Sequence, residues 1–153
     1  MDCIEKIENG NNFMLDTCFI NDLIDTSDHK IINILKNKTL FYTSVQESEI
    51  RNIKDENKRS KILDLLKTLN MSKLQRKMMQ WNDDLYWDDD DLMCCDESEA
   101  YIAINKNTKS DADGSIFDVC ISNKLILITS DKKFNNKCGK FDESSVIFYD
   151  KRK

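Results

Sequence analysis

Short apolar runs alternate with stretches of helical periodicity along this 153-residue chain. In the helical stretches, apolar residues recur every three or four positions, as they do on the buried face of a helix. Four compact runs rich in apolar or β-forming side chains lie between them, at 13–15, 39–43, 125–128 and 145–149. Strands separated by helices are typical of an α/β fold with a mainly parallel sheet. The pattern therefore predicts one α/β domain over residues 1–153.

The expected helices are positioned by their apolar spacing and by polar residues at their ends. They cover residues 19–24, 28–37, 44–53, 60–69, 72–80, 98–106 and 113–124. The segment 81–95, with aromatic residues set among aspartates, is expected to be irregular. Cys18 and Cys120 fall within apolar stripes and are expected to be small core residues.

The pattern at the start of the helix at 44–53 predicts different roles for two neighbouring glutamates, Glu47 and Glu49. Ser44 and Glu47 have the spacing of a capping box, in which each side chain satisfies a free backbone N–H of the first turn. Glu49 lies in one row with Val45 and Ile53, the row expected to face the sheet. A carboxylate in such a row is costly unless it is paired. We therefore expect a structural role for Glu47 and a metal-binding role for Glu49.

Charge is unevenly distributed along the chain. The formal net charge is −5, but nine of the 28 acids lie between Asp83 and Glu99, where there is no Lys or Arg. The other 19 acids face 23 basic residues, so the remaining surface can approach a polyanion. His29 is the only histidine, and no cysteine pair has zinc-site spacing, so histidine-base and zinc chemistry are poorly supported. Without a secretory signal or a membrane-length apolar run, we expect a cytoplasmic protein that does not enter a membrane.

Acids follow the predicted strands. Asp16 ends the first strand, Glu49 follows the second, Asp131 follows the third, and Asp113 opens the helix that leads into the third. Taken singly, each aspartate is more often a helix cap or turn residue. In a parallel sheet, however, the carboxyl ends of the strands share one edge, where ligands bind. Carboxylates that repel one another there favour Mg²⁺ or Mn²⁺, and this predicts a metal-dependent phosphodiesterase.

The motifs around these acids also resemble a known family. They are Phe13-Met-Leu-Asp16-Thr17, Ser44-Val-Gln-Glu-Ser-Glu49-Ile, Asp113-x-x-Ile116-x-x-x-Cys120 and Leu-Ile-Leu-Ile-Thr129-Ser-Asp131. In order and spacing they look like the PIN domain family, particularly its VapC-like toxin ribonucleases. The resemblance covers nearly the whole chain. It implies an α/β/α sandwich that cleaves RNA with Mg²⁺ or Mn²⁺. The catalytic and metal-holding residues it implies are Asp16, Glu49, Asp113 and Asp131, with Thr17 and Thr129 as supporting hydroxyls.

Three function classes follow from these patterns. The leading hypothesis is a single-strand-specific or structure-specific endoribonuclease, either a toxin held silent by an antitoxin or an RNA-processing nuclease that is not a toxin. The lysines expected to meet the RNA backbone are Lys132, Lys133, Lys137 and Lys140. The second hypothesis is a non-catalytic PIN-like module that binds a protein partner through the acidic segment, and a homodimer is compatible with either. A phosphoacceptor domain of receiver type is the third, and it lacks a suitable acceptor aspartate at a strand end.

Overall fold

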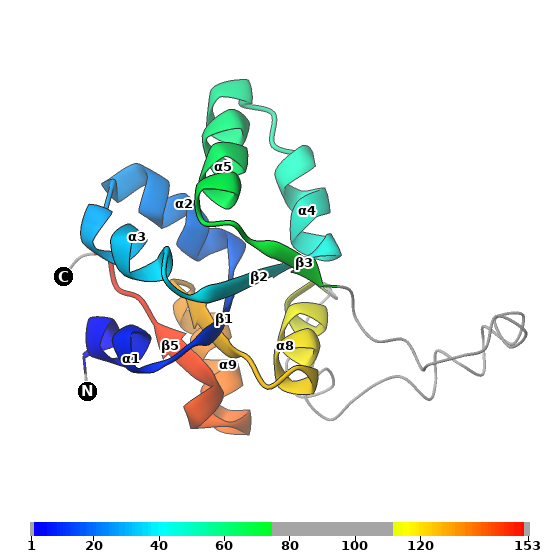
Figure 1. Ribbon diagram of the computed structural model, residues 1–153. Helices are drawn as coiled ribbons and strands as arrows, with labels where there is room; N and C mark the ends of the chain where they lie inside the picture. Colours follow the sequence, from blue (N-terminus) through cyan, green and yellow to red (C-terminus); the bar gives the residue numbers. More distant parts are fainter. Residues whose placement is uncertain (1, 75–111, 152–153) are drawn as a thin grey trace, which may run out of the picture.

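A five-stranded parallel sheet forms the centre of the computed structural model, which describes residues 2–74 and 112–151 (Figure 1). The strand order is β3-β2-β1-β4-β5, so the first strand lies in the middle. The strands are β1 (Asn12–Leu15), β2 (Thr39–Thr43), β3 (Ser72–Leu74), β4 (Ile126–Thr129) and β5 (Val146–Phe148). All four strand pairs are parallel, which confirms the predicted α/β fold.

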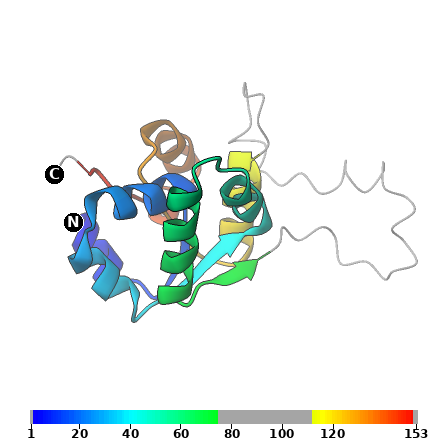
Figure 2. The same cartoon turned by 90° about the horizontal axis from the view of Figure 1, so that it is seen from above.

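Helices cover both faces of the sheet (Figures 1 and 2). They are α1 (Cys3–Asn9), α2 (Thr17–Thr26), α3 (His29–Leu35), α4 (Ser44–Arg51), α5 (Glu56–Thr68), α8 (Ala112–Ser122) and α9 (Lys132–Phe141). A short 3₁₀ helix, η2 (Glu143–Ser145), leads into β5. None of the helices within residues 2–74 and 112–151 has both the length and the apolarity to cross a bilayer.

Alternation along β1 divides the core into two layers. Phe13 and Leu15 are buried with residues of α1, α2, α3 and α5, whereas Met14 is buried with residues of α8 and α9. Successive side chains of a strand point to opposite faces of a sheet, so a strand with helices on both sides is apolar throughout. This explains why Phe13-Met-Leu15 has no polar position.

Several elements differ from the prediction. Residues 72–74 form the edge strand β3, and not the start of a helix as predicted. Three other expectations lie outside the described residues: the continuation of that helix to residue 80, the irregular segment 81–95 and the helix at 98–106. Helices α1 and α9 were not predicted. Helix α5 begins at Glu56 because the Asp55 side chain accepts hydrogen bonds from two backbone N–H groups of its first turn. Cys18 is exposed on α2, so its expected place in the core is wrong.

The start of α4 lies one residue earlier than the predicted capping box. The cap is Thr43, whose hydroxyl accepts from Gln46 N–H at 3.2 Å, while Gln46 Oε1 accepts from Thr43 N–H at 2.7 Å. Ser44 and Glu47 therefore do not form the box. Glu47 instead makes ion pairs with Arg51 and Lys73, the latter at 3.0 Å.

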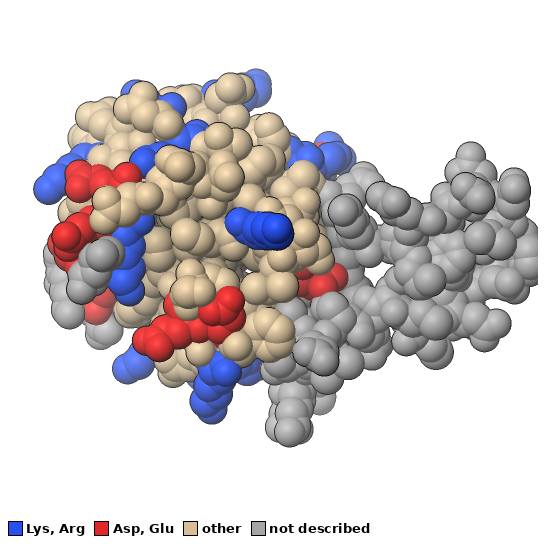
Figure 3. Space-filling model, turned by 60° about the horizontal axis from the view of Figure 1, so that its bottom comes forward, with Lys and Arg blue, Asp and Glu red and all other residues tan. Residues whose placement is uncertain are grey.

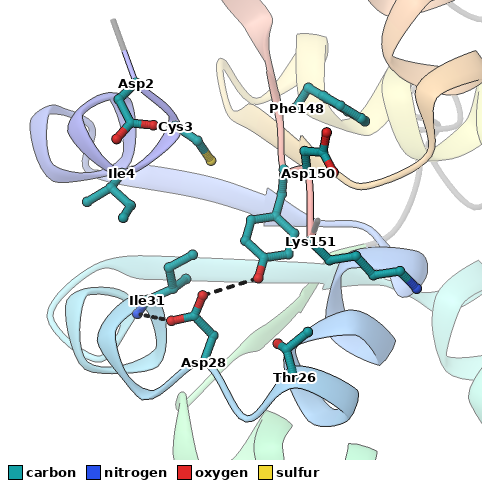
Figure 4. Close-up of a pocket in the computed structure, with 10 residues that line it drawn as sticks. Asp2, Cys3, Ile4, Thr26, Asp28, Ile31, Phe148, Asp150 and Lys151 are labelled. Carbon is teal, nitrogen blue, oxygen red and sulfur yellow. Dashed lines mark hydrogen bonds between the residues drawn. The ribbon is translucent and has the colours of Figure 1, made fainter. Parts of the chain in front are cut away.

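The end of β5 is attached to the corner between α2 and α3. Tyr149 donates its hydroxyl to Asp28 Oδ2 at 3.1 Å, one of the dashed hydrogen bonds to Asp28 in Figure 4. The Tyr149 ring meets Phe19 edge-on at a centroid distance of 5.2 Å. Burial raises the pKa of Tyr149 because the phenolate would lose its hydration. The preceding side chain, Phe148, points away from Asp28 in the same view.

Candidate metal centre

Asp16 lies where β1 ends and α2 begins, and only 5% of it is exposed. Its Oδ1 accepts a hydrogen bond from Thr17 N–H at 2.8 Å, and its Oδ2 accepts one from the Thr129 hydroxyl at 2.7 Å. Its own N–H donates to Ile128 O at 3.0 Å. The carboxylate is thereby fixed between the ends of β1 and β4, as the prediction required.

Asp131 and Thr129 join this carboxylate to the start of α9. The Thr129 hydroxyl, which donates to Asp16, also accepts from Asp131 N–H at 3.1 Å. Asp131 Oδ1 accepts from Lys133 N–H at 2.9 Å and from Phe134 N–H at 3.2 Å, so it caps α9. Both capping hydrogen bonds are accepted by Oδ1, so capping α9 does not occupy Asp131 Oδ2.

Glu49 reaches the same place from the outer side of α4. Thr17 Oγ1 donates to Glu49 Oε2 at 3.0 Å, a contact that joins α2 to α4. The expected row of Val45, Glu49 and Ile53 does not face the sheet, because Gln46 and Ile50 are the fully buried residues of this helix. Glu49 is therefore correctly placed near Asp16, although the reason given for it was wrong.

Gln46 is a site-supporting residue that the sequence prediction missed. Its Nε2 donates to Leu15 O, the carbonyl of the peptide that ends in Asp16 N. The N–H and C=O of one trans peptide point in opposite directions, so this peptide is held by Gln46 on one side and by Ile128 O on the other. The Thr-x-x-Gln spacing of a capping box was the available signal.

The charges of the predicted quartet influence one another. The pKa of Asp16 is raised to about 7, first by burial and then by the charges of Asp113 and Glu49, against the hydrogen bonds from Thr129 and Thr17. The pKa of Glu49 is raised by burial and by Asp113. The pKa of Asp113, in the first turn of α8, is raised by burial and by Asp131. Asp113 thus connects all three other carboxylates.

A divalent cation is the group that this set of donors fits. Carboxylates crowded at one place are destabilised by burial and mutual repulsion, and a hard cation with oxygen ligands removes both penalties. Within residues 2–74 and 112–151, no three His, Cys, Asp or Glu side chains are already arranged as a ligand group. Glu49 is partly exposed and Asp113 is half-buried. The residues that would hold Mg²⁺ or Mn²⁺ are those of the predicted quartet.

The predicted lysines all lie on α9, the helix that starts at the site. Lys137 is half-buried and lowers the pKa of Asp113, whereas Lys132, Lys133 and Lys140 are exposed. On the face drawn in Figure 3, lysines and arginines are interspersed with acids and do not form one continuous basic patch. On this face, contact with a polyanion would therefore depend on individual side chains.

Cys18 follows Thr17 on α2 and lies within reach of the same charges. The pKa of its thiol is raised to about 12, first by desolvation and then by the charges of Asp16 and Asp131. A thiol with such a pKa is not a nucleophile at neutral pH. The adjacent Cys94 and Cys95, like the acidic segment 83–99, lie outside the described residues.

Comparison of the chain with protein-family models, curated proteins and solved structures finds no match, so membership of the PIN domain family stays a prediction that rests on the motifs.

Proposed function

We propose that this protein is a metal-dependent endoribonuclease that hydrolyses RNA phosphodiester bonds with Mg²⁺ or Mn²⁺. One observation carries the proposal. Asp16, Glu49, Asp113 and Asp131 come from four separate segments, and the charge of Asp113 acts on Asp16 and Glu49 while Asp131 acts on Asp113. Such an arrangement lowers stability unless a ligand uses it.

The residues of the site divide into metal ligands, hydroxyls that orient them and lysines that attract the substrate. The four carboxylates hold the cation, Thr129 orients Asp16, and Thr17 orients both Asp16 and Glu49. When bound, the cation supplies charge stabilisation at the phosphoryl group and a water of lowered pKa. The lysines of α9 attract the phosphates of the RNA. In the cell, we propose a cytoplasmic enzyme, either a toxin silenced by an antitoxin or an RNA-processing nuclease.

We expect purified protein to cleave single-stranded RNA with Mg²⁺ or Mn²⁺ and to stop when EDTA is added. Carboxylate oxygens without histidine or thiolate select these hard cations. The measurement is the length of a labelled RNA on a denaturing gel, with the Asp113→Asn variant purified in parallel as the control for contaminating nucleases. Cleavage that persists in EDTA, or that needs zinc, contradicts the mechanism.

Glu49→Gln is expected to reduce the rate of RNA cleavage at least about tenfold, whereas the rate of Glu47→Gln is expected to stay close to that of the wild-type protein. A glutamine at position 49 can still accept the hydrogen bond from the Thr17 hydroxyl, so the variant removes the charge and keeps the contact. Glu47 pairs with Lys73 and Arg51, which lower its pKa. Initial rates and the Mn²⁺ affinity from calorimetry decide this prediction. Equal losses in both variants would contradict the separation of the two glutamates.

A second candidate is a non-catalytic PIN-like protein-interaction module, possible partners including a second copy of the chain. It is favoured by the finding that no metal-ligand group is preformed within the described residues. Thermal melts separate the two candidates, because a cation that binds the folded protein raises its melting temperature. If millimolar Mg²⁺ and Mn²⁺ leave the melting temperature unchanged, the interaction module is supported.

A further inference from the structure

A cleft of about 480 Å³ runs beside β5, between α1 and α9. Its volume lies in the range of small-molecule binding sites. Its lining combines basic, amide and aromatic side chains, and consists of Lys6, Asn135, Asn136, Gly139, Lys140, Glu143, Val146 and Phe148. It has no role in the hydrogen-bonded site around Asp16.

The cleft begins one strand away from the carboxylates. Phe148 is the register partner of Thr129, the residue whose hydroxyl donates to Asp16 at 2.7 Å. On the other wall, Asn135 N–H donates to Asp131 O at 2.9 Å, one turn into α9. A polymer bound at the carboxylates therefore has the cleft directly within reach of its next unit.

The chemistry of the lining matches one unit of a single-stranded nucleic acid. The half-buried ring of Phe148 lines the cleft, and Figure 4 shows that it points away from Asp28. An aromatic face of this kind stacks on any unpaired base. The amides of Asn135 and Asn136 can donate to and accept from base edges.

Charge along the cleft is consistent with this ligand. Lys6 and Lys140 stand on opposite walls and attract phosphate, and Glu143 is the one acid in the lining. A carboxylate can accept from the exocyclic amino group of a base. A base that remains in a duplex cannot enter the cleft, because its edges are paired and its faces stacked.

Gly139 gives an independent reason to regard the cleft as a binding space. A glycine inside a helix destabilises the helix relative to alanine. Gly139 has no positive φ, and a Cβ added to it would meet no atom within 4 Å, so neither backbone conformation nor packing requires glycine. What its missing side chain does provide is width in the wall of the cleft.

We propose that this cleft receives an unpaired base of single-stranded RNA, next to the phosphate that lies at the carboxylates; the proposal rests on the proposed function. It extends that function by assigning a base-binding subsite to this cleft. Phe148 supplies the stacking surface, and the absence of a side chain at Gly139 leaves room for the base.

The test measures binding of a fluorescently labelled single-stranded RNA by anisotropy, in Mg²⁺ and in an Asp16→Asn background that does not cleave. Phe148→Leu and Gly139→Leu are each expected to weaken binding roughly tenfold, in line with the loss of one base–aromatic stack. Neither variant changes binding of a duplex of the same sequence. Lys61→Gln, an exposed charge change on α5, is the matched control and leaves both affinities unchanged.

The outcomes separate this proposal from the proposed function. If both folded variants bind single-stranded RNA as tightly as the parent, or if the parent does not prefer single strands to duplex, the base subsite is overturned. If Phe148→Leu does not fold, as judged by circular dichroism, Gly139→Leu decides alone, since its side chain enters open space. Cleft-dependent binding without Mg²⁺-dependent or Mn²⁺-dependent cleavage by the wild-type chain would uphold the subsite and reject the hydrolase.

Discussion

Asp16→Asn is expected to lower RNA cleavage by more than about 100-fold, beyond the 10–100-fold typical of residues that only support a metal ligand. The same change is expected to raise the stability of the metal-free protein at pH 8. Asp16 is 5% exposed and has a pKa of about 7, so its ionised form is disfavoured in the folded state. Asparagine keeps an oxygen for Thr17 N–H and removes the charge.

The pH dependence has a definite sign. The folded-state pKa of Asp16 lies above the usual aspartate value of 3.8, so the folded protein binds this proton more tightly than the unfolded chain does. The contribution of Asp16 to stability therefore falls as the pH rises from about 4 to about 7 and is constant above that, with a total penalty on the order of 4 kcal/mol. Part of the gain in the asparagine variant is offset, because its amide nitrogen replaces the oxygen that accepts from Thr129.

Thermal melts of both proteins in EDTA between pH 4 and pH 8 check this prediction. The difference in melting temperature should favour Asp16→Asn at pH 8 and disappear or reverse at pH 4. Added Mg²⁺ should raise the melting temperature of the wild-type protein only. A wild-type protein that is the more stable of the two at pH 8 in EDTA would identify Asp16 as a structural cap.

Gln46→Ala is expected to lower the free energy of unfolding by about 3–5 kcal/mol. Gln46 is fully buried, and the change leaves a cavity and removes the partners of Thr43 N–H and Leu15 O. Urea denaturation gives the magnitude. Ser48→Ala, an exposed change on the same helix, should stay within about 0.5 kcal/mol of wild type.

Gln46→Glu distinguishes the two hydrogen bonds of the Gln46 side chain, one accepted from Thr43 N–H and one donated to Leu15 O. A glutamate still accepts from Thr43 N–H, but it donates to Leu15 O only when it is protonated. Burial raises the pKa of such a carboxyl, so stability should be partly retained at pH 5 and lost as the pH rises. If Gln46→Glu unfolds at the same urea concentration as wild type at pH 8, Gln46 does not hold the peptide that carries Asp16.

The sequence predicts those parts of the fold that local patterns determine. Four strands were recognisable because each is a continuous apolar or β-forming run. Strand β3 was not, since Ser72-Lys73-Leu74 forms a strand through pairing with β2, and an edge strand needs no apolar run. Helix α9 carried a usable signal that was not applied, with Phe134 and Cys138 buried four residues apart on one face.

The site was predicted by topology and not by helix geometry. Parallel strands bring their carboxyl ends to one edge, and this alone places Asp16 and Asp131 together. The face of α4 was wrong because Thr43 and Ser44 are both suitable caps, and a shift of one residue turns every side chain by about 100°. Only the pairing of Thr43 with Gln46 distinguishes the two registers.

The position of β1 in the middle of the sheet also sets the order in which the site is assembled. β1, β2 and β3 can associate as soon as the first half of the chain has been synthesised, but β1 pairs on its other side with β4, more than 100 positions later. The Thr129 hydroxyl that holds Asp16 is likewise 113 positions away in sequence. Closing so long a loop is slow, so a ribosome-bound chain presents an open strand edge and separated carboxylates for most of its synthesis. The carboxylates contributed by the two halves of the chain therefore come together only when β4 pairs with β1, late in synthesis.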